Sequence, residues 1–120
     1  MVVIKFNLGK KGEEKASKFL IDKGYKIVEN NFRVSGVEID IIAKKDNFLC
    51  FIEVKTRTSN DFGFPEEFVD FRKRQKIIRG AKIFSAKKPF KDFYKRFDII
   101  SVLYKNKKFE INHIENAFEE

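Results

Sequence analysis

The stretch from Gly36 to Arg57 limits most strongly what this chain can fold into. It reads GVEIDIIAKKDNFLCFIEVKTR, in which two apolar runs, 37–43 and 48–54, flank the polar segment 44–47. Two strand-like runs around a short polar segment predict a β-hairpin. Acidic residues nevertheless lie inside both runs, where a strand buried on both faces should carry none. We therefore expect the hairpin to carry a chemical site.

Because side chains alternate along a strand, the residues of each run can be assigned to faces. On the first strand Glu38 and Asp40 should share one face. The apolar residues of that strand should share the opposite face: Val37, Ile39 and Ile41. On the second strand the charged residues should share a face with an aromatic ring: Phe51, Glu53 and Lys55.

If the two charged faces coincide, Asp40, Glu53 and Lys55 converge on one small patch. Two carboxylates can hold a hard cation, and the lysine can orient or deprotonate a water molecule. The alternative is a buried ion pair between Lys55 and either acid, which adds little net stability. The surplus of negative charge favours a metal site.

Composition bounds the class of protein. A chain of 120 residues forms one domain, 1–120, and a hydrophobic content of 42% is enough for a core and argues against disorder. The net charge of +8 suggests a polyanionic partner or serves solubility, and the uneven spread of the basic residues favours the partner.

Cysteine and histidine are scarce, which limits nucleophilic and zinc chemistry. The single cysteine, Cys50, lies inside a strand and is expected to be a core residue, not a nucleophile. A catalytic triad would have to use His113, the one histidine. No apolar run approaches the ~20 residues of a membrane span, and no secretion signal is visible, so we expect a cytoplasmic protein without membrane contact.

The rest of the chain predicts an α/β sandwich in which helices flank a central mixed sheet of about five strands. The elements around the hairpin are expected to be a helix over 13–23 with Glu13 facing inward, a strand over 25–34 with an irregularity at Asn30-Asn31, a loop over 58–67, a helix over 66–87, a central strand over 96–104 and an edge strand over 109–114. The order is therefore α-β-β-β-α-β-β.

The helix over 66–87 is basic on one side, which suits either contact with phosphates or a solvated face. Lys73 precedes the apolar Ile77 by four positions, so it should lean toward the core and the acidic patch. In the preceding loop, Phe62 and Phe64 could stack on bases or pack back onto the body of the protein.

An acid on one strand followed by Glu-x-Lys on the next resembles the PD-(D/E)XK nuclease superfamily, which has the restriction-endonuclease-like fold. A closer resemblance, to the bacterial YraN family, covers nearly the whole chain. It rests on Gly12-Glu13-x-x-Ala16, Asn31-x-Arg33, Glu38-Ile39-Asp40-Ile41-Ile42-Ala43, Phe51-Ile52-Glu53-Val54-Lys55-Thr56-Arg57, Arg96-Phe97-Asp98 and His113-Ile114-x-Asn116-Ala117-Phe118. This family is similar to archaeal Holliday junction resolvases. Val37 stands where the family usually has glycine directly before Glu-Ile-Asp.

The resemblance implies a catalytic set of four residues: Glu13, Asp40, Glu53 and Lys55. Asp40 and Glu53 would ligate Mg²⁺ or Mn²⁺ with help from a backbone carbonyl near Val54, and Glu13 would hold the metal through water. Lys55 would position or activate the attacking water, and Glu38 is the reserve acid. Basic residues on or near the second strand of the hairpin and on the basic helix are the expected contacts with nucleic acid: Arg57, Arg72, Lys73, Arg74 and Lys76.

Three functions follow as hypotheses. The first is a metal-dependent nuclease acting on DNA, with branched DNA as one candidate substrate and a homodimer left open by the resolvase similarity. The second is a nucleic-acid-binding module that keeps the fold without turnover. The third is a basic scaffold for a protein partner, which the salt dependence of binding would separate from the first two.

Overall fold

Helices and strands follow one another in the predicted order along the described part of the chain. The computed structural model describes residues 7–58, 69–87 and 89–120. Its elements are α1 (Leu8–Asp22), β1 (Lys26–Val34), β2 (Val37–Lys45), β3 (Phe48–Arg57), α2 (Phe71–Ser85), β4 (Tyr94–Lys105) and β5 (Lys108–Phe118). The predicted α/β class and the order α-β-β-β-α-β-β are confirmed.

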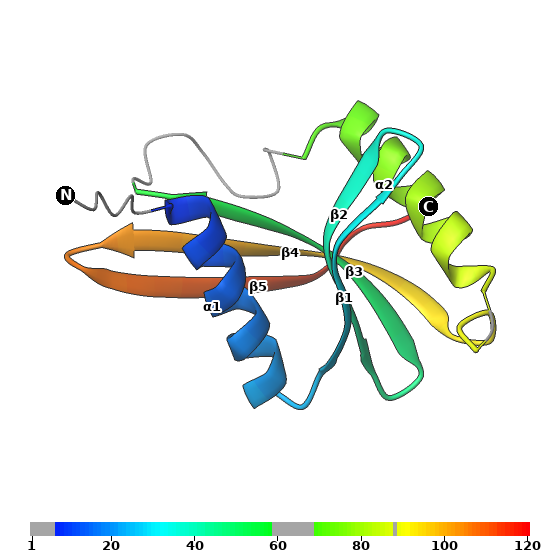
Figure 1. Cartoon of the computed structure of the whole chain (residues 1–120), viewed down its shortest axis with the longest axis horizontal. Coiled ribbons are helices and arrows are strands. Elements are labelled where there is room, and N and C mark those ends of the chain that lie inside the picture. Colours follow the sequence, from blue (N-terminus) through cyan, green and yellow to red (C-terminus); the bar gives the residue numbers. More distant parts are fainter. Residues whose placement is uncertain (1–6, 59–68, 88) are drawn as a thin grey trace, which may run out of the picture.

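The strands form one mixed sheet in the order β1-β2-β3-β4-β5 (Figure 1). β3 and β4 are parallel because α2 carries the chain back between them, and the other neighbours are antiparallel. β4 lies inside the sheet and is buried on both faces, whereas β5 is an edge strand, as the sequence predicts. The predicted hairpin is β2 and β3, joined at Asp46-Asn47.

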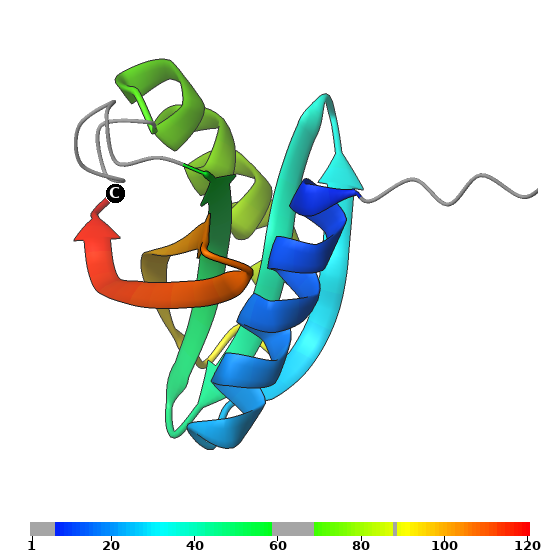
Figure 2. The ribbon, with the colours of Figure 1, turned by 90° about the vertical axis from the view of Figure 1, so that its left-hand side faces the viewer.

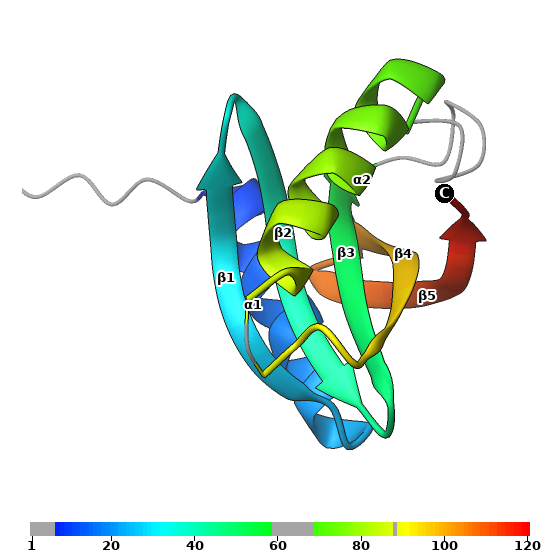
Figure 3. The same ribbon diagram turned by 90° about the vertical axis from the view of Figure 1, so that its right-hand side faces the viewer.

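The two helices cover opposite faces of the sheet (Figures 2 and 3). On one face, Ala16 and Leu20 of α1 belong to a buried cluster that includes Ile52. On the other face, Ala81 and Phe84 of α2 belong to a cluster built around Phe51 and Ile39. Each helix therefore has its own apolar layer, and the molecule is a sandwich.

Both helices begin at capping residues that the sequence prediction missed. α1 begins at Leu8 and not at Glu13, because the Asn7 side chain accepts a hydrogen bond from the Lys10 amide at 3.0 Å. α2 begins at Phe71 and not at Glu66, because Asp70 accepts from the Lys73 amide at 2.9 Å.

Part of the predicted loop and helix falls in residues 59–68, outside the described residues. The expectations for Phe62 and Phe64 therefore lie outside the described residues as well.

The predicted face assignment of β2 is wrong for one residue. Val37 and Ile39 pack in the cluster under α2, as expected of neighbours on one face, but Ile41 packs in the cluster under α1. The change of face occurs at Asp40, which falls with Asn31 between the paired residues Asn30–Ile41 and Phe32–Ile39. Asn31 has a left-handed backbone with φ of 52°, which confirms the irregularity predicted for β1 and explains why the two strands turn over together.

Candidate metal centre and nucleic-acid interface

Asp40 stands where β2 and β3 separate. The paired register of the hairpin runs from Lys45 and Phe48 to Ile41 and Ile52 and ends there. Directly before Ile41 on β2, the Asp40 carboxylate accepts a hydrogen bond from the Val54 backbone amide of β3 at 2.8 Å. The side chain therefore takes the place of a strand carbonyl, and this contact fixes its direction.

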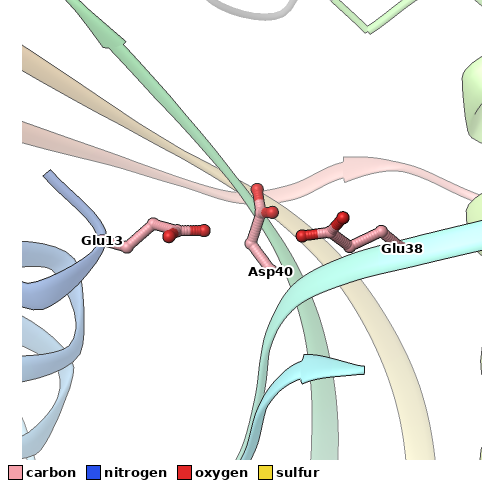
Figure 4. Close-up of side chains that lie close together, drawn as sticks. All are labelled: Glu13, Glu38 and Asp40. Carbon is pink, nitrogen blue, oxygen red and sulfur yellow. The ribbon is translucent and has the colours of Figure 1, made fainter. Parts of the chain in front are cut away.

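Three carboxylates from two elements meet at this point. Glu13 of α1 and Glu38 and Asp40 of β2 bring their oxygens within 4.8 Å of one another (Figure 4). With its nitrogen turned toward them, the Asn31 amide donates to Glu13 at 3.2 Å and to Glu38 at 3.3 Å. Burial, followed by the charges of Asp40 and Glu38, raises the pKa of Glu13. Arg33 also pairs with Glu38, at 3.3 Å. Three carboxylates with one such ion pair among them still carry surplus negative charge.

Glu53 adds a buried carboxylate from β3. Only 6% of this residue is exposed, and its Oε1 lies 3.2 Å from Lys73 Nζ, whereas Oε2 is buried without a hydrogen-bond partner. Burial, together with the neighbouring Asp40 carboxylate, raises the pKa of Glu53 to about 8, against the opposing effect of Lys73. A buried acceptor without a partner is costly, and it is a free ligand atom.

The two lysines of the site have opposite pKa shifts. Burial, and then the neighbouring Lys73 ammonium, lowers the pKa of Lys55. Burial by itself would lower the pKa of Lys73 as well. The ion pair with Glu53 has the larger effect, so the pKa of Lys73 is raised. Lys55 is therefore the lysine more easily deprotonated, and Lys73 is the counter-charge of Glu53 when that acid is ionised.

Two hollows flank the acids and share them. The first, with a volume of about 650 Å³, is lined by Glu13, Lys55 and Thr56 together with the shared acids. The second, of about 440 Å³, is lined by basic residues of α2. The acids that line both hollows are Glu38, Asp40 and Glu53. A ligand lying along this surface would pass the carboxylates with α1 on one side and α2 on the other.

The basic residues named from the sequence divide into two groups. Arg72 and Lys76 are exposed and line the second hollow together with Lys73. Arg74 has contacts inside the protein: its Nε donates to the Val69 carbonyl at 2.7 Å, and its guanidinium lies 5.5 Å from the centre of the Phe118 ring.

Arg57 is the last residue of β3 and is partly buried. It follows Thr56, which lines the first hollow.

The structure therefore brings together Glu13, Asp40, Glu53, Lys55 and Lys73, as expected, and the reserve acid Glu38 with them. Sequence reasoning predicted the irregularity at Asn31 but missed the contact of its side chain with Glu13 and Glu38. The available signal was an asparagine within a strand pattern, since asparagine tolerates left-handed backbone and marks a turn in the chain direction.

A second polar cluster, around Asp98, is structural. The fully buried Asp98 carboxylate accepts hydrogen bonds from Arg96 at 2.7 Å and from the Asn116 amide at 2.9 Å, and it lies 2.8 Å from His113 Nε2. Although burial opposes it, hydrogen bonding to His113 and Arg96 lowers the pKa of Asp98. These contacts tie β5 to β4, and every oxygen of Asp98 is occupied.

Cys50, predicted to be a core residue, is fully buried. Burial raises the pKa of its thiol to about 12, which suits a core position and not a nucleophile. Neither helix in the described residues is both long and apolar enough to cross a membrane.

The fold and site define an α/β sandwich protein with a carboxylate cluster at a strand divergence, placed between an N-terminal helix and a strongly basic one. The chain belongs to the uncharacterised protein family UPF0102, whose family model matches residues 12–102, and the expected YraN membership is thereby confirmed.

Relatives match over almost their whole length. A UPF0102 protein of Caldanaerobacter subterraneus subsp. tengcongensis is 48% identical, over 97% of this chain and 98% of the relative. Similar proteins occur in Thermodesulfovibrio yellowstonii, at 47% identity over 95% of this chain and 97% of the relative, and in Clostridium perfringens, at 45% over 93% of each.

Proposed function

We propose that this protein is a metal-dependent nuclease of the restriction-endonuclease-like type, related to resolvases, which hydrolyses phosphodiester bonds in DNA. The observation that carries the proposal is Glu53, a buried carboxylate with an unpartnered Oε2 beside Asp40. A protein that only needed to bind DNA would gain nothing from such a group, because carboxylates repel phosphates unless a cation lies between them.

The donor set fits a hard cation. All the available ligand atoms are carboxylate oxygens, which suit Mg²⁺ or Mn²⁺ better than zinc. Asp40 and Glu53 would hold the ion, with Glu13 acting through water and Glu38 close enough to replace or assist it. Bound there, Mg²⁺ or Mn²⁺ would stabilise the negative charge that develops on the phosphate and acidify a bound water.

The other residues would act directly on the substrate and on the attacking water. Lys55 lines the same hollow as the acids, and its lowered pKa suits a group that orients water and accepts a proton from it. The two hollows that share the acids form one acidic cleft. Arg72 and Lys76 would bind phosphates on the α2 side of this cleft. Lys73 lines the same hollow and would be a further contact for a phosphate.

One observation favours a second candidate, a nucleic-acid-binding module without turnover. The ion pair at 3.2 Å between Lys73 Nζ and Glu53 Oε1 already neutralises one acid from within the protein. If that pair persists when nucleic acid binds, the acids are structural and the basic helix is the functional surface.

Cleavage by matched variants tests the proposal. Labelled duplex, single-stranded, flapped and four-way-junction DNAs are incubated with Mg²⁺ or Mn²⁺ and wild-type protein, Asp40→Asn or Lys55→Ala. We expect wild-type protein to cut at least one substrate in a metal-dependent way and both variants to lose cleavage with the fold retained. Metal-dependent cleavage that persists in purified Asp40→Asn would reject the assigned site. If wild-type protein binds these DNAs but cuts none of them, the result would favour the binding module.

A further inference from the structure

Phe71 is an aromatic side chain that the protein leaves in solvent. It is 75% exposed, more than any other large hydrophobic side chain in the described residues, where Tyr94 follows at 68%. Exposed apolar side chains are common singly, but a ring this exposed at a functional surface needs a reason.

The ring is held on a rigid support. Phe71 is the first residue of α2, directly after the cap Asp70, whose side chain binds the Lys73 amide. The residue before the cap, Val69, is fully buried, and its carbonyl accepts the Arg74 guanidinium at 2.7 Å. The backbone on both sides of Phe71 is therefore fixed, and the ring is presented in a defined place at little further entropic cost.

The surroundings of the ring are cationic and continuous with the acidic cleft. Phe71 lines a hollow of about 590 Å³ with Arg72, Gln75, Lys76 and Arg79. Arg72 and Lys76 also line the hollow that contains Asp40 and Glu53. The sequence of α2, FRKRQKIIRGAKIFS, contains no acid at all. A chain of phosphates that reaches the carboxylates can therefore continue across Arg72 and Lys76 to Phe71.

We propose that Phe71 stacks on an unpaired nucleobase, so that the substrate of the acidic cleft is nucleic acid with a single-stranded segment beside the bond that is cut. The inference rests on the proposed function and specifies its substrate class. An aromatic ring flanked by cations is the usual platform for a base in single-stranded nucleic acid, since cations hold the backbone and the ring covers a base face. Inside a duplex both faces of each base are already covered by neighbouring bases, which leaves nothing for the ring to cover.

The chain offers a direct probe because it contains no tryptophan. Phe71→Trp would place the sole indole at the proposed platform, where stacking on a base quenches its fluorescence. Tyr94→Trp is the matched control, because Tyr94 is comparably exposed but packs beside Phe48 at the start of β3 and lines neither hollow of the cleft.

Each tryptophan variant is titrated at low salt, without divalent metal, with a single-stranded oligonucleotide and with the duplex of the same sequence, while binding is followed by anisotropy of the labelled DNA. For Phe71→Trp we expect the indole to be quenched by the single strand and little quenched by the duplex. For Tyr94→Trp we expect no quenching by either DNA.

Three results would overturn the inference. The first is single-strand binding that leaves the indole fluorescence of Phe71→Trp unchanged, and the second is equal quenching of that indole by the duplex. The third is quenching by an acidic polypeptide but not by DNA, because Phe71 would then belong to a protein interface.

Affinity in the wild-type background supplies the second readout. Phe71→Ala should weaken single-strand binding about tenfold, the effect of losing one stacked base, whereas Phe71→Tyr should restore it. Unchanged affinity in Phe71→Ala alongside metal-dependent cleavage would remove the platform and leave the nuclease proposal standing. Quenching of the Phe71→Trp indole by a single strand, in a protein that binds no metal and cuts no DNA, would keep the platform and reject the nuclease.

Discussion

The Asp40 carboxylate accepts a hydrogen bond from the Val54 backbone amide at 2.8 Å, so an acid on β2 is aimed by the strand that carries Glu53. This contact replaces a rung of the β2–β3 ladder, which ends one residue earlier at Ile41 and Ile52. The same side chain therefore closes the hairpin and forms part of the acidic site. Its two roles can be separated by substitution.

Asp40→Asn and Asp40→Ala should differ in stability but not in metal binding. The asparagine oxygen can still accept from Val54, whereas alanine leaves that amide unpaired in a partly buried place, at a cost of about 1–3 kcal/mol. Urea denaturation without metal measures the difference, and calorimetry with Mn²⁺ should show weakened binding in both variants. Equal stability of the two variants would mean that the Val54 contact contributes nothing to the fold.

Glu53 should make the metal-free protein less stable as pH rises. The folded protein holds the Glu53 proton up to about pH 8, whereas the unfolded chain loses it near its ordinary pKa of 4.5. Between these values unfolding releases a proton, so the stability present below pH 4.5 is lost progressively toward pH 8, at up to about 1.4 kcal/mol per pH unit.

Glu53→Gln carries no such proton and is the matched variant. Its unfolding free energy relative to wild type should rise from about pH 5 to about pH 8 in buffer containing a metal chelator. A difference between the two proteins that does not change with pH would show that Glu53 titrates normally and is not held in a desolvated site.

Much of the site could be predicted because strand alternation is a local property. The second strand of the hairpin follows it: Glu53 and Lys55 lie toward Lys73 of α2, on the face opposite Ile52, as predicted. Helical spacing likewise directed Lys73 toward the acids, where it pairs with Glu53.

What the sequence could not supply depends on single backbone conformations and on register between elements. The left-handed Asn31 turns β1 and β2 over, and it sends Ile41 to the face opposite Ile39. A face assignment made from alternation assumes a regular strand backbone at every residue, so a single left-handed residue makes it fail. The exposure of Phe71 was hidden in the same way, because the predicted helix began five residues too early and made Phe71 an interior position instead of the first turn.

Gly12→Ala should disturb both the packing of α1 and the position of Glu13. A Cβ at Gly12 would overlap the Thr56 side chain and would lie 2.9 Å from its Cβ and Cγ2, so α1 would have to move away from β3. We expect a loss of about 1–3 kcal/mol in unfolding free energy and weaker Mn²⁺ binding, because α1 carries Glu13.

Gly9→Ala is the control within the same helix. Its Cβ would meet nothing closer than Asn7 Oδ1 at 3.6 Å. The better helix former should therefore stabilise the protein by about 0.4–1 kcal/mol. Thermal denaturation of the two variants should give shifts of opposite sign. Shifts of the same sign would contradict the close α1–β3 contact.

Arg72 and Lys76 should contribute to binding, and Arg74 to stability. Arg72→Ala and Lys76→Ala should each weaken DNA binding and reduce the slope of log affinity against log salt by about 1, as expected for one lost phosphate contact. Arg74→Ala removes the bond to the Val69 carbonyl and should lower the melting temperature while leaving the salt slope unchanged. An equal fall of the slope in Arg74→Ala would place that residue in the interface too.

Calorimetric titration of Mn²⁺ into wild-type protein and Glu53→Gln at about pH 8 tests the central claim most directly. The two side chains have nearly the same shape, and circular dichroism can establish that the fold is retained. If Glu53 and Asp40 form a metal centre, wild-type protein binds Mn²⁺ and the variant binds it at least about tenfold more weakly, the loss expected when a ligand oxygen loses its charge. Equal Mn²⁺ affinity in the two proteins would contradict the claim and leave the buried acids as structural partners of Lys73.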